Sequence, residues 1–106
     1  MSGTILIGEK KALPLSTSAF DYLVDKIKVE FKEGDEEYRD EIYFPRDEGG
    51  MTFIDLRNQD EEGFLAFYRA TERAYIAASE EDVFPAYEVV WRSLLDLLGA
   101  DSRSGK

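Results

Sequence analysis

The chain has 106 residues, and its 13 lysines and arginines against 23 aspartates and glutamates give a net charge of −10. It contains no cysteine and no histidine, which excludes disulfides, thiolate metal sites and every catalytic triad built on histidine. A chain of this length forms one domain, and about 65% of its surface can be buried around a single core.

The first segment predicts a strand at the N-terminus. A β-branched and apolar run begins at Thr4, and Gly8 with the charges after it indicates a turn. Pro14 cannot donate a hydrogen bond to a central ladder, so residues 12–15 should form an edge strand or a connector. The N-terminus has neither the basic region of a signal peptide nor an apolar run long enough for a membrane span, and a cytoplasmic location is expected.

A helix is predicted over residues 18–33, because five apolar residues recur on one helical face. Ser18 with Asp21 is a variant of the capping box, and Gly34 suits the position just after a helix end. The later part, 27–31, also alternates, so a strand there is the competing interpretation. The apolar positions are Phe20, Leu23, Val24, Ile27 and Phe31.

Residues 40–57 predict a β-hairpin. The run 42–44 reads as its first strand and 51–56 as its second, with a turn-rich loop containing two glycines between them. Pro45 would then sit at the end of a strand, where its missing N–H is tolerated.

Two further helices are predicted over 61–78 and 84–98. Asp60 can cap the first, and Pro85 suits the first turn of the second. The second has the clearest amphipathic pattern in the chain, and Gly99 ends it. Residues 100–106 lack large apolar side chains and are expected to fray.

These elements predict an α+β fold: a small, mainly antiparallel sheet, made of the N-terminal strand and the hairpin near 40–57, packed against about three helices. The expected single compact domain spans 1–99. The three helices are those at 18–33, 61–78 and 84–98.

The densest acidic stretch covers residues 30–41. It does not fit a calcium-binding EF-hand loop, because Arg39 and Arg46 occupy ligand positions in that template. The simplest reading is a solvated loop. The functional alternative is an acidic docking patch in which tyrosines supply the central contacts and carboxylates steer a partner. The candidate binding residues are Asp35, Glu36, Glu37, Tyr38, Asp40, Glu41 and Tyr43.

The acids at 60–62 and 80–82 need no function, because they precede predicted helices and suit the positive end of the helix dipole. The segment 64–75 carries more aromatic side chains than one helical face requires. Core packing is the simplest explanation, and an exposed remainder would mark a homodimer or partner surface.

The charge argues against nucleic acid and anionic membranes as partners and favours a basic protein. No residue pattern calls for a cofactor or metal. The favoured hypothesis is a bacterial, intracellular immunity protein or inhibitor that neutralises a basic, nuclease-type toxin by electrostatic docking. The alternative is a small acidic secretion or assembly chaperone that acts as a homodimer. A metal-dependent enzyme that uses carboxylates alone ranks last.

Overall fold

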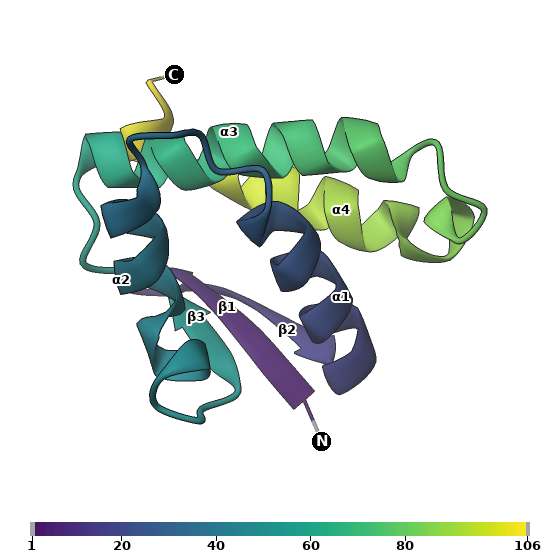
Figure 1. The fold of residues 1–106 in the computed structure, drawn as a ribbon, viewed down its shortest axis with the longest axis horizontal. Coiled ribbons are helices and arrows are strands. Elements are labelled where there is room, and N and C mark those ends of the chain that lie inside the picture. Colours follow the sequence, from purple (N-terminus) through teal and green to yellow (C-terminus); the bar gives the residue numbers. More distant parts are fainter. Residues whose placement is uncertain (1, 106) are drawn as a thin grey trace.

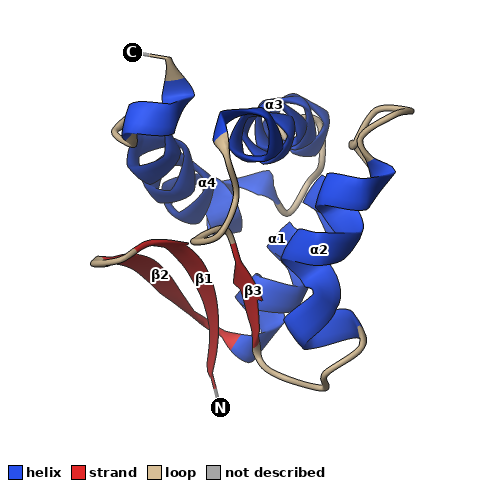
Figure 2. Ribbon diagram, turned by 90° about the vertical axis from the view of Figure 1, so that its left-hand side faces the viewer, coloured by secondary structure: helices blue, strands red, loops and turns tan. Residues whose placement is uncertain are grey.

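The computed structural model describes residues 2–105, which fold into a small sheet with helices gathered on one side of it (Figures 1 and 2). α3 and α4 run across the top of the molecule in Figure 1, whereas α1 and α2 descend in front of the strands. In chain order the elements are β1 (Ser2–Gly8), β2 (Lys11–Ser16), α1 (Thr17–Lys28), α2 (Glu36–Asp47), β3 (Phe53–Asp55), α3 (Glu61–Ala78), α4 (Phe84–Gly99) and the 3₁₀ turn η1 (Ser102–Ser104).

The sheet is mixed, with strand order β2-β1-β3. β1 pairs antiparallel with β2, so that Ile5 lies opposite Leu13, and pairs parallel with β3, so that Ile5 also lies opposite Ile54. The α+β class is therefore confirmed, but the hairpin expected over 40–57 is wrong. β2 is an edge strand, as Pro14 predicts.

Residues 36–47 form a helix where the sequence predicts a solvated acidic loop followed by a strand over 42–44. Ile42 and Tyr43 are buried, and Arg39 and Arg46 lie half-buried beside them, so the inward face recurs at helical spacing. Two of these inward positions carry arginine, which packs through its aliphatic stem. An apolar pattern alone therefore does not reveal the helix.

Pro45 lies inside α2, although proline removes one backbone hydrogen bond from a helix. The helical pattern nevertheless continues, because the Glu48 amide donates to the Phe44 carbonyl at 2.9 Å. Gly50 then adopts a left-handed conformation, with φ of 66°, in the loop that leads to β3.

α1 starts earlier than expected. The N-cap is Ser16, whose hydroxyl accepts a hydrogen bond from the Ala19 amide at 3.3 Å, and not Ser18. Gly34 does not follow the end of this helix directly. It lies in the loop before α2, where its φ of 100° suits glycine.

α1 also ends at Lys28, short of the 18–33 prediction. Phe31 still packs against the core, but from the loop. Arg73 of α3 donates two hydrogen bonds, at 3.0 and 2.7 Å, to the carbonyl of Glu30. The Arg73 side chain thus holds the loop that follows α1 in place, although this loop is not helical.

The predictions for α3 and α4 are confirmed, with bounds close to those expected. Asp60 caps α3 by accepting a hydrogen bond from the Gly63 amide at 2.9 Å, and Pro85 lies in the first turn of α4. The aromatic side chains of α3 at Phe64, Phe67 and Tyr68 are buried, so core packing explains them.

The C-terminal segment does not fray as expected over the residues the structure describes. Ser102–Ser104 form a 3₁₀ turn, and Arg103 donates to the carbonyls of Ile7, Leu56 and Gln59 at 2.7–2.8 Å. One polar side chain thus joins the chain end to β1 and to the segment after β3. The expectation for Lys106 lies outside the described residues.

Candidate protein-binding surface

The outward side of α2 carries much of the acidic stretch. Its exposed residues recur three or four positions apart, so they form one stripe along the helix. All but one are carboxylates. We call this set the acidic face of α2: Glu37, Asp40, Glu41, Phe44, Asp47 and Glu48.

Phe44 is the apolar member of this face and lies at its centre. Its side chain is 59% exposed, which is unusual for a phenyl ring among charged neighbours. It lines a hollow of about 240 Å³ together with Glu41 and Pro45, and another of about 410 Å³ together with Lys28 and Asp47. The ring thus stands between two shallow depressions in an acidic surround.

Two of the carboxylates on this face are partly neutralised. The Lys28 ammonium lies 2.6 Å from the Asp47 carboxylate, and the Arg39 guanidinium lies 3.0 Å from that of Asp40. These pairs are exposed and contribute little to stability. Within residues 2–105, the acids of this face that form no such salt bridge are Glu37, Glu41 and Glu48.

α2 is fastened to α1 from its inward side. The Arg46 guanidinium lies 2.9 Å from the Asp25 carboxylate and 3.4 Å from that of Asp21. The same group lies over the ring of Phe20, 6.0 Å from its centroid. These contacts hold the acidic face on a rigid support.

Tyr43 is not a surface residue, contrary to its assignment as a contact for a partner. It is 1% exposed, and its hydroxyl donates a hydrogen bond of 2.6 Å to the Val24 carbonyl. Burial raises the pKa of this hydroxyl well above its ordinary value. The residue joins α2 to α1 and belongs to the core.

Three other candidates lie at the start of α2. Asp35 is the N-cap residue and is half-buried, and the exposed Glu36 accepts a hydrogen bond from the Gly34 amide at 2.8 Å. The Tyr38 hydroxyl donates to Glu62 of α3 at 3.0 Å, and this hydrogen bond raises its pKa. Asp35 and Tyr38 border the acidic face, and the exposed Glu36 lies one helical turn before Asp40, at the N-terminal end of that face.

Three of the sequence candidates, Glu37, Asp40 and Glu41, do lie on the acidic face. Sequence reasoning missed Phe44, because a strand interpretation of 42–44 gives no reason to expose that residue. A helical interpretation would have identified it, since residues 37, 40, 41 and 44 share one face at spacings of three and four.

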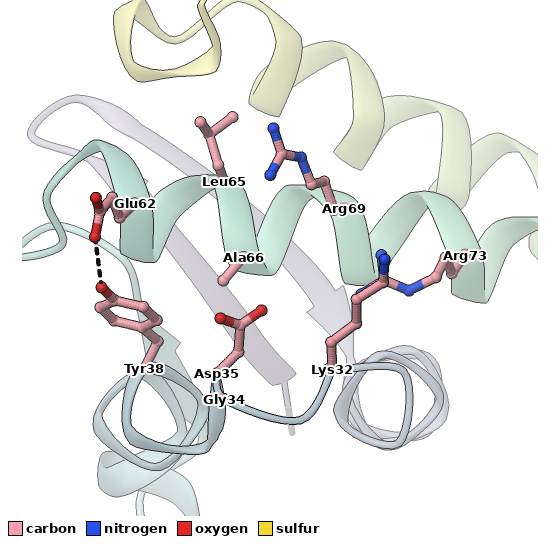
Figure 3. Close-up of a pocket in the computed structure, with 9 residues that line it drawn as sticks. All are labelled: Lys32, Gly34, Asp35, Tyr38, Glu62, Leu65, Ala66, Arg69 and Arg73. Carbon is pink, nitrogen blue, oxygen red and sulfur yellow. Dashed lines mark hydrogen bonds between the residues drawn. The ribbon is translucent and has the colours of Figure 1, made fainter.

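A groove of about 500 Å³ lies between the start of α2 and α3 (Figure 3). In this view α3 carries Glu62, Arg69 and Arg73 along its length, and Lys32 and Asp35 rise from the loop below it. The groove therefore contains several basic side chains on a strongly acidic protein.

Several members of the other acidic clusters have structural roles. Glu61 and Glu62 lie in the first turn of α3, after the capping Asp60. Glu81 forms an ion pair with Lys26 and accepts a hydrogen bond from Tyr22. Those hydrogen bonds lower the pKa of Glu81, whereas burial and the contact with Glu81 raise the pKa of Tyr22 to about 12.

Within residues 2–105, side chains able to bind a metal ion do not gather in any group of three or more. Among the same residues, every helix is too short or too polar to cross a membrane.

Comparison with known proteins shows which family this chain belongs to. The chain is 41% identical over 105 residues to a protein of Burkholderia pseudomallei described as immunity protein CdiI, covering 99% of this chain and 96% of that relative. The chain belongs to the CdiI family of immunity proteins. The prediction of an immunity protein is therefore confirmed, and CdiI membership favours it over the chaperone and enzyme alternatives.

The fold agrees with the CdiI assignment. The solved structure described as the CdiA-CT toxin from Burkholderia pseudomallei E479 in complex with its cognate CdiI immunity protein contains a chain that superposes with a TM-score of 0.93. That chain is 40% identical, and the match covers 96% of this chain and 98% of that one. No family model matches the sequence.

Proposed function

We propose that this chain neutralises a CdiA-CT toxin by binding it through the acidic face of α2. The observation that supports this surface is Phe44, 59% exposed in the middle of a row of carboxylates. A related chain occurs in a structure described as a complex of a CdiA-CT toxin with its cognate CdiI protein. A toxin is therefore the expected partner for this chain as well.

The acidic face has the composition expected of a binding site. Protein interfaces take most of their binding energy from a few residues, and aromatic side chains surrounded by less critical contacts are typical of them. α2 is held against α1 by Arg46 and Tyr43, so little ordering is needed when the partner binds. Phe44 would enter a recess in the toxin, and the carboxylates would surround it.

The charge favours a basic toxin, as expected for an enzyme that acts on nucleic acid. A negative surface attracts a cationic cleft over long range and raises the association rate. It also competes with phosphate groups for the same cations. The chain would then act by occupying the toxin, without chemistry of its own, in the cytoplasm of the cell that it protects.

The test is the rate at which this chain associates with its cognate CdiA-CT toxin domain, measured at low and high salt. The double variant Glu37→Lys with Glu48→Lys reverses two exposed charges on the acidic face that form no salt bridge with a described residue. We expect it to slow association at least tenfold at low salt, with little change in melting temperature.

The matched control is Glu80→Lys with Asp82→Lys. These exposed acids lie in the loop between α3 and α4, at the far end of the molecule from α2 (Figure 1), and their reversal changes the net charge equally. The control should slow association much less. Equal slowing by both double variants would show that only net charge matters and would reject the acidic face as the binding surface.

A further inference from the structure

The groove between α3 and the loop before α2 differs in charge from the rest of the protein. We propose that it is a second docking point, which receives a carboxylate side chain of the bound toxin. This inference rests on the proposed function and adds to it an ion pair of opposite polarity. The groove measures about 500 Å³, which leaves ample room for an aspartate or glutamate side chain.

Cations that lack a carboxylate partner are concentrated at this groove. Across residues 2–105, most lysines and arginines form a salt bridge with an aspartate or glutamate. Those that form none with a described residue are Lys10, Lys11, Lys32, Arg69 and Arg73. The last three of these line the groove.

Arg73 is held in place by a neutral group. Its Nε and one Nη donate to the Glu30 carbonyl at 3.0 and 2.7 Å, so its orientation is fixed while its charge is not cancelled by an acid. A guanidinium has five N–H donors, and these bonds leave others available to a carboxylate. Arg69 lies one helical turn earlier on the same face of α3 and is exposed.

Two acids also line the groove. The Glu62 carboxylate accepts a hydrogen bond from Tyr38 at 3.0 Å, at the end of the groove away from Arg73 (Figure 3). Asp35 is the half-buried N-cap of α2, but its side chain forms no cap hydrogen bond and points into the groove toward Ala66, between Tyr38 and Lys32 (Figure 3). The cationic end is therefore the part formed by Arg69, Arg73 and Lys32, and this end is suited to an anionic group.

The groove is continuous with the proposed interface. Asp35 and Tyr38 lie at the start of α2 and also line the groove, so a toxin that covers the acidic face reaches its edge. Contacts between many carboxylates and a basic protein do not by themselves fix its orientation. An ion pair in which this chain supplies the cation and the toxin supplies the carboxylate adds that constraint. A toxin carboxylate is therefore the expected occupant of the groove.

The test compares two substitutions that remove one positive charge each. Arg69→Gln removes a cation from the groove. Lys10→Gln removes one from the β1–β2 turn, which lies on the opposite side of the molecule from the loop before α2 (Figure 2). Both make the chain more acidic, which by itself strengthens binding to a basic toxin. We expect Lys10→Gln to leave the Kd unchanged or lower it, and Arg69→Gln to raise it about tenfold.

A double-mutant cycle identifies the occupant. Each exposed aspartate or glutamate of the toxin is replaced in turn by its amide, and each toxin variant is measured against both the original chain and Arg69→Gln. At the toxin position that contacts Arg69, combining the two substitutions should lower the affinity no more than either substitution alone. If Arg69→Gln binds as tightly as Lys10→Gln, the groove is not a docking point. The proposed function still stands in that case if the Glu37→Lys with Glu48→Lys variant associates slowly.

Binding of inorganic phosphate tests whether the groove holds a free anion and not a carboxylate of the toxin. If phosphate binds the free chain with micromolar Kd while Arg69→Gln leaves toxin affinity unchanged, the groove takes a free anion and the docking proposal is wrong. Failure of phosphate to compete with the toxin at physiological concentration, together with the tenfold loss in Arg69→Gln, supports it.

Discussion

Tyr43 and Phe44 are adjacent in the chain, yet Tyr43 is 1% exposed and bonded to the Val24 carbonyl, whereas Phe44 is 59% exposed. A helix turns by about 100° per residue, so neighbours at the edge of its buried face can point to different environments. The two aromatic side chains therefore have separate roles. Tyr43 stabilises the fold, and Phe44 is available to a partner.

Phe44→Ala should weaken toxin binding without weakening the fold. Removing a central aromatic contact from an interface typically costs at least about 2 kcal/mol, which corresponds to a roughly 30-fold higher Kd. Because the ring is largely exposed in the free chain, the melting temperature should hardly change. Calorimetric titration and thermal unfolding give the two values. Unchanged affinity would exclude Phe44 from the interface.

Tyr43→Phe should show the reverse behaviour. The substitution removes one buried hydroxyl and its hydrogen bond to the Val24 carbonyl, which costs about 1–3 kcal/mol of unfolding free energy. Urea denaturation measures this loss. The affinity of the folded variant for the toxin should stay within a factor of two. A selective loss of affinity would instead place Tyr43 in the binding surface, where the sequence analysis assigned it.

The sequence was sufficient for α3 and α4, where local signals agree. Apolar residues recur at helical spacing, Asp60 supplies a cap and Pro85 suits a first turn. It was insufficient for α2, because two inward positions of that helix carry arginine, and a proline at position 45 argues against a helix in the sequence. The parallel pairing of β1 with β3 depends on a crossover through α1 and α2, which no local pattern encodes.

The same strand interpretation led to the choice of Tyr43, which is buried, as an aromatic candidate in place of the exposed Phe44. The acids at Glu37, Asp40 and Glu41 were placed in the binding region because their number alone draws attention. Choosing between Tyr43 and Phe44 needed the secondary structure of the segment. The groove cations Arg69 and Arg73 were not identified, since they stand out only when the salt bridges of the other basic residues are known.

Pro45→Ala should stabilise the protein. Alanine restores a backbone donor inside α2 and has the higher helix propensity, whereas proline in a helix interior costs about 3 kcal/mol. Part of this gain is offset because alanine makes the unfolded chain more flexible. We expect a net increase of about 1–2 kcal/mol in the free energy of unfolding. A decrease would show that the ring makes packing contacts that outweigh the missing bond.

Arg103→Ala should destabilise the C-terminal segment and the elements it joins. The guanidinium donates to the carbonyls of Ile7, Leu56 and Gln59, and hydrogen bonds to charged groups contribute about 1.5–3 kcal/mol each when buried. Since water can reach part of this site in the variant, we expect a total loss of about 2–4 kcal/mol. Hydrogen exchange should show faster exchange in η1 and in the nearby end of α4. Unchanged protection would mean that the segment is held by other contacts.

Asp101 makes the stability of the fold depend on pH in the acidic range. Its carboxylate accepts hydrogen bonds from Arg103 at 2.9 Å, and these hold its pKa below the ordinary value. A lowered folded-state pKa means that the ionised group stabilises the fold above the unfolded pKa of about 4, and that this stabilisation is lost as the pH falls through the folded pKa.

Asp101→Asn should therefore be less stable than the original chain by about 1.5–3 kcal/mol at neutral pH, and this difference should shrink below pH of about 4. Urea denaturation from pH 7 to 3 measures it. Asp82→Asn, at an exposed position between α3 and α4, is the control and should show little difference at any pH. If the Asp101→Asn difference stays constant as the pH falls, the carboxylate contributes through packing and not through its charge.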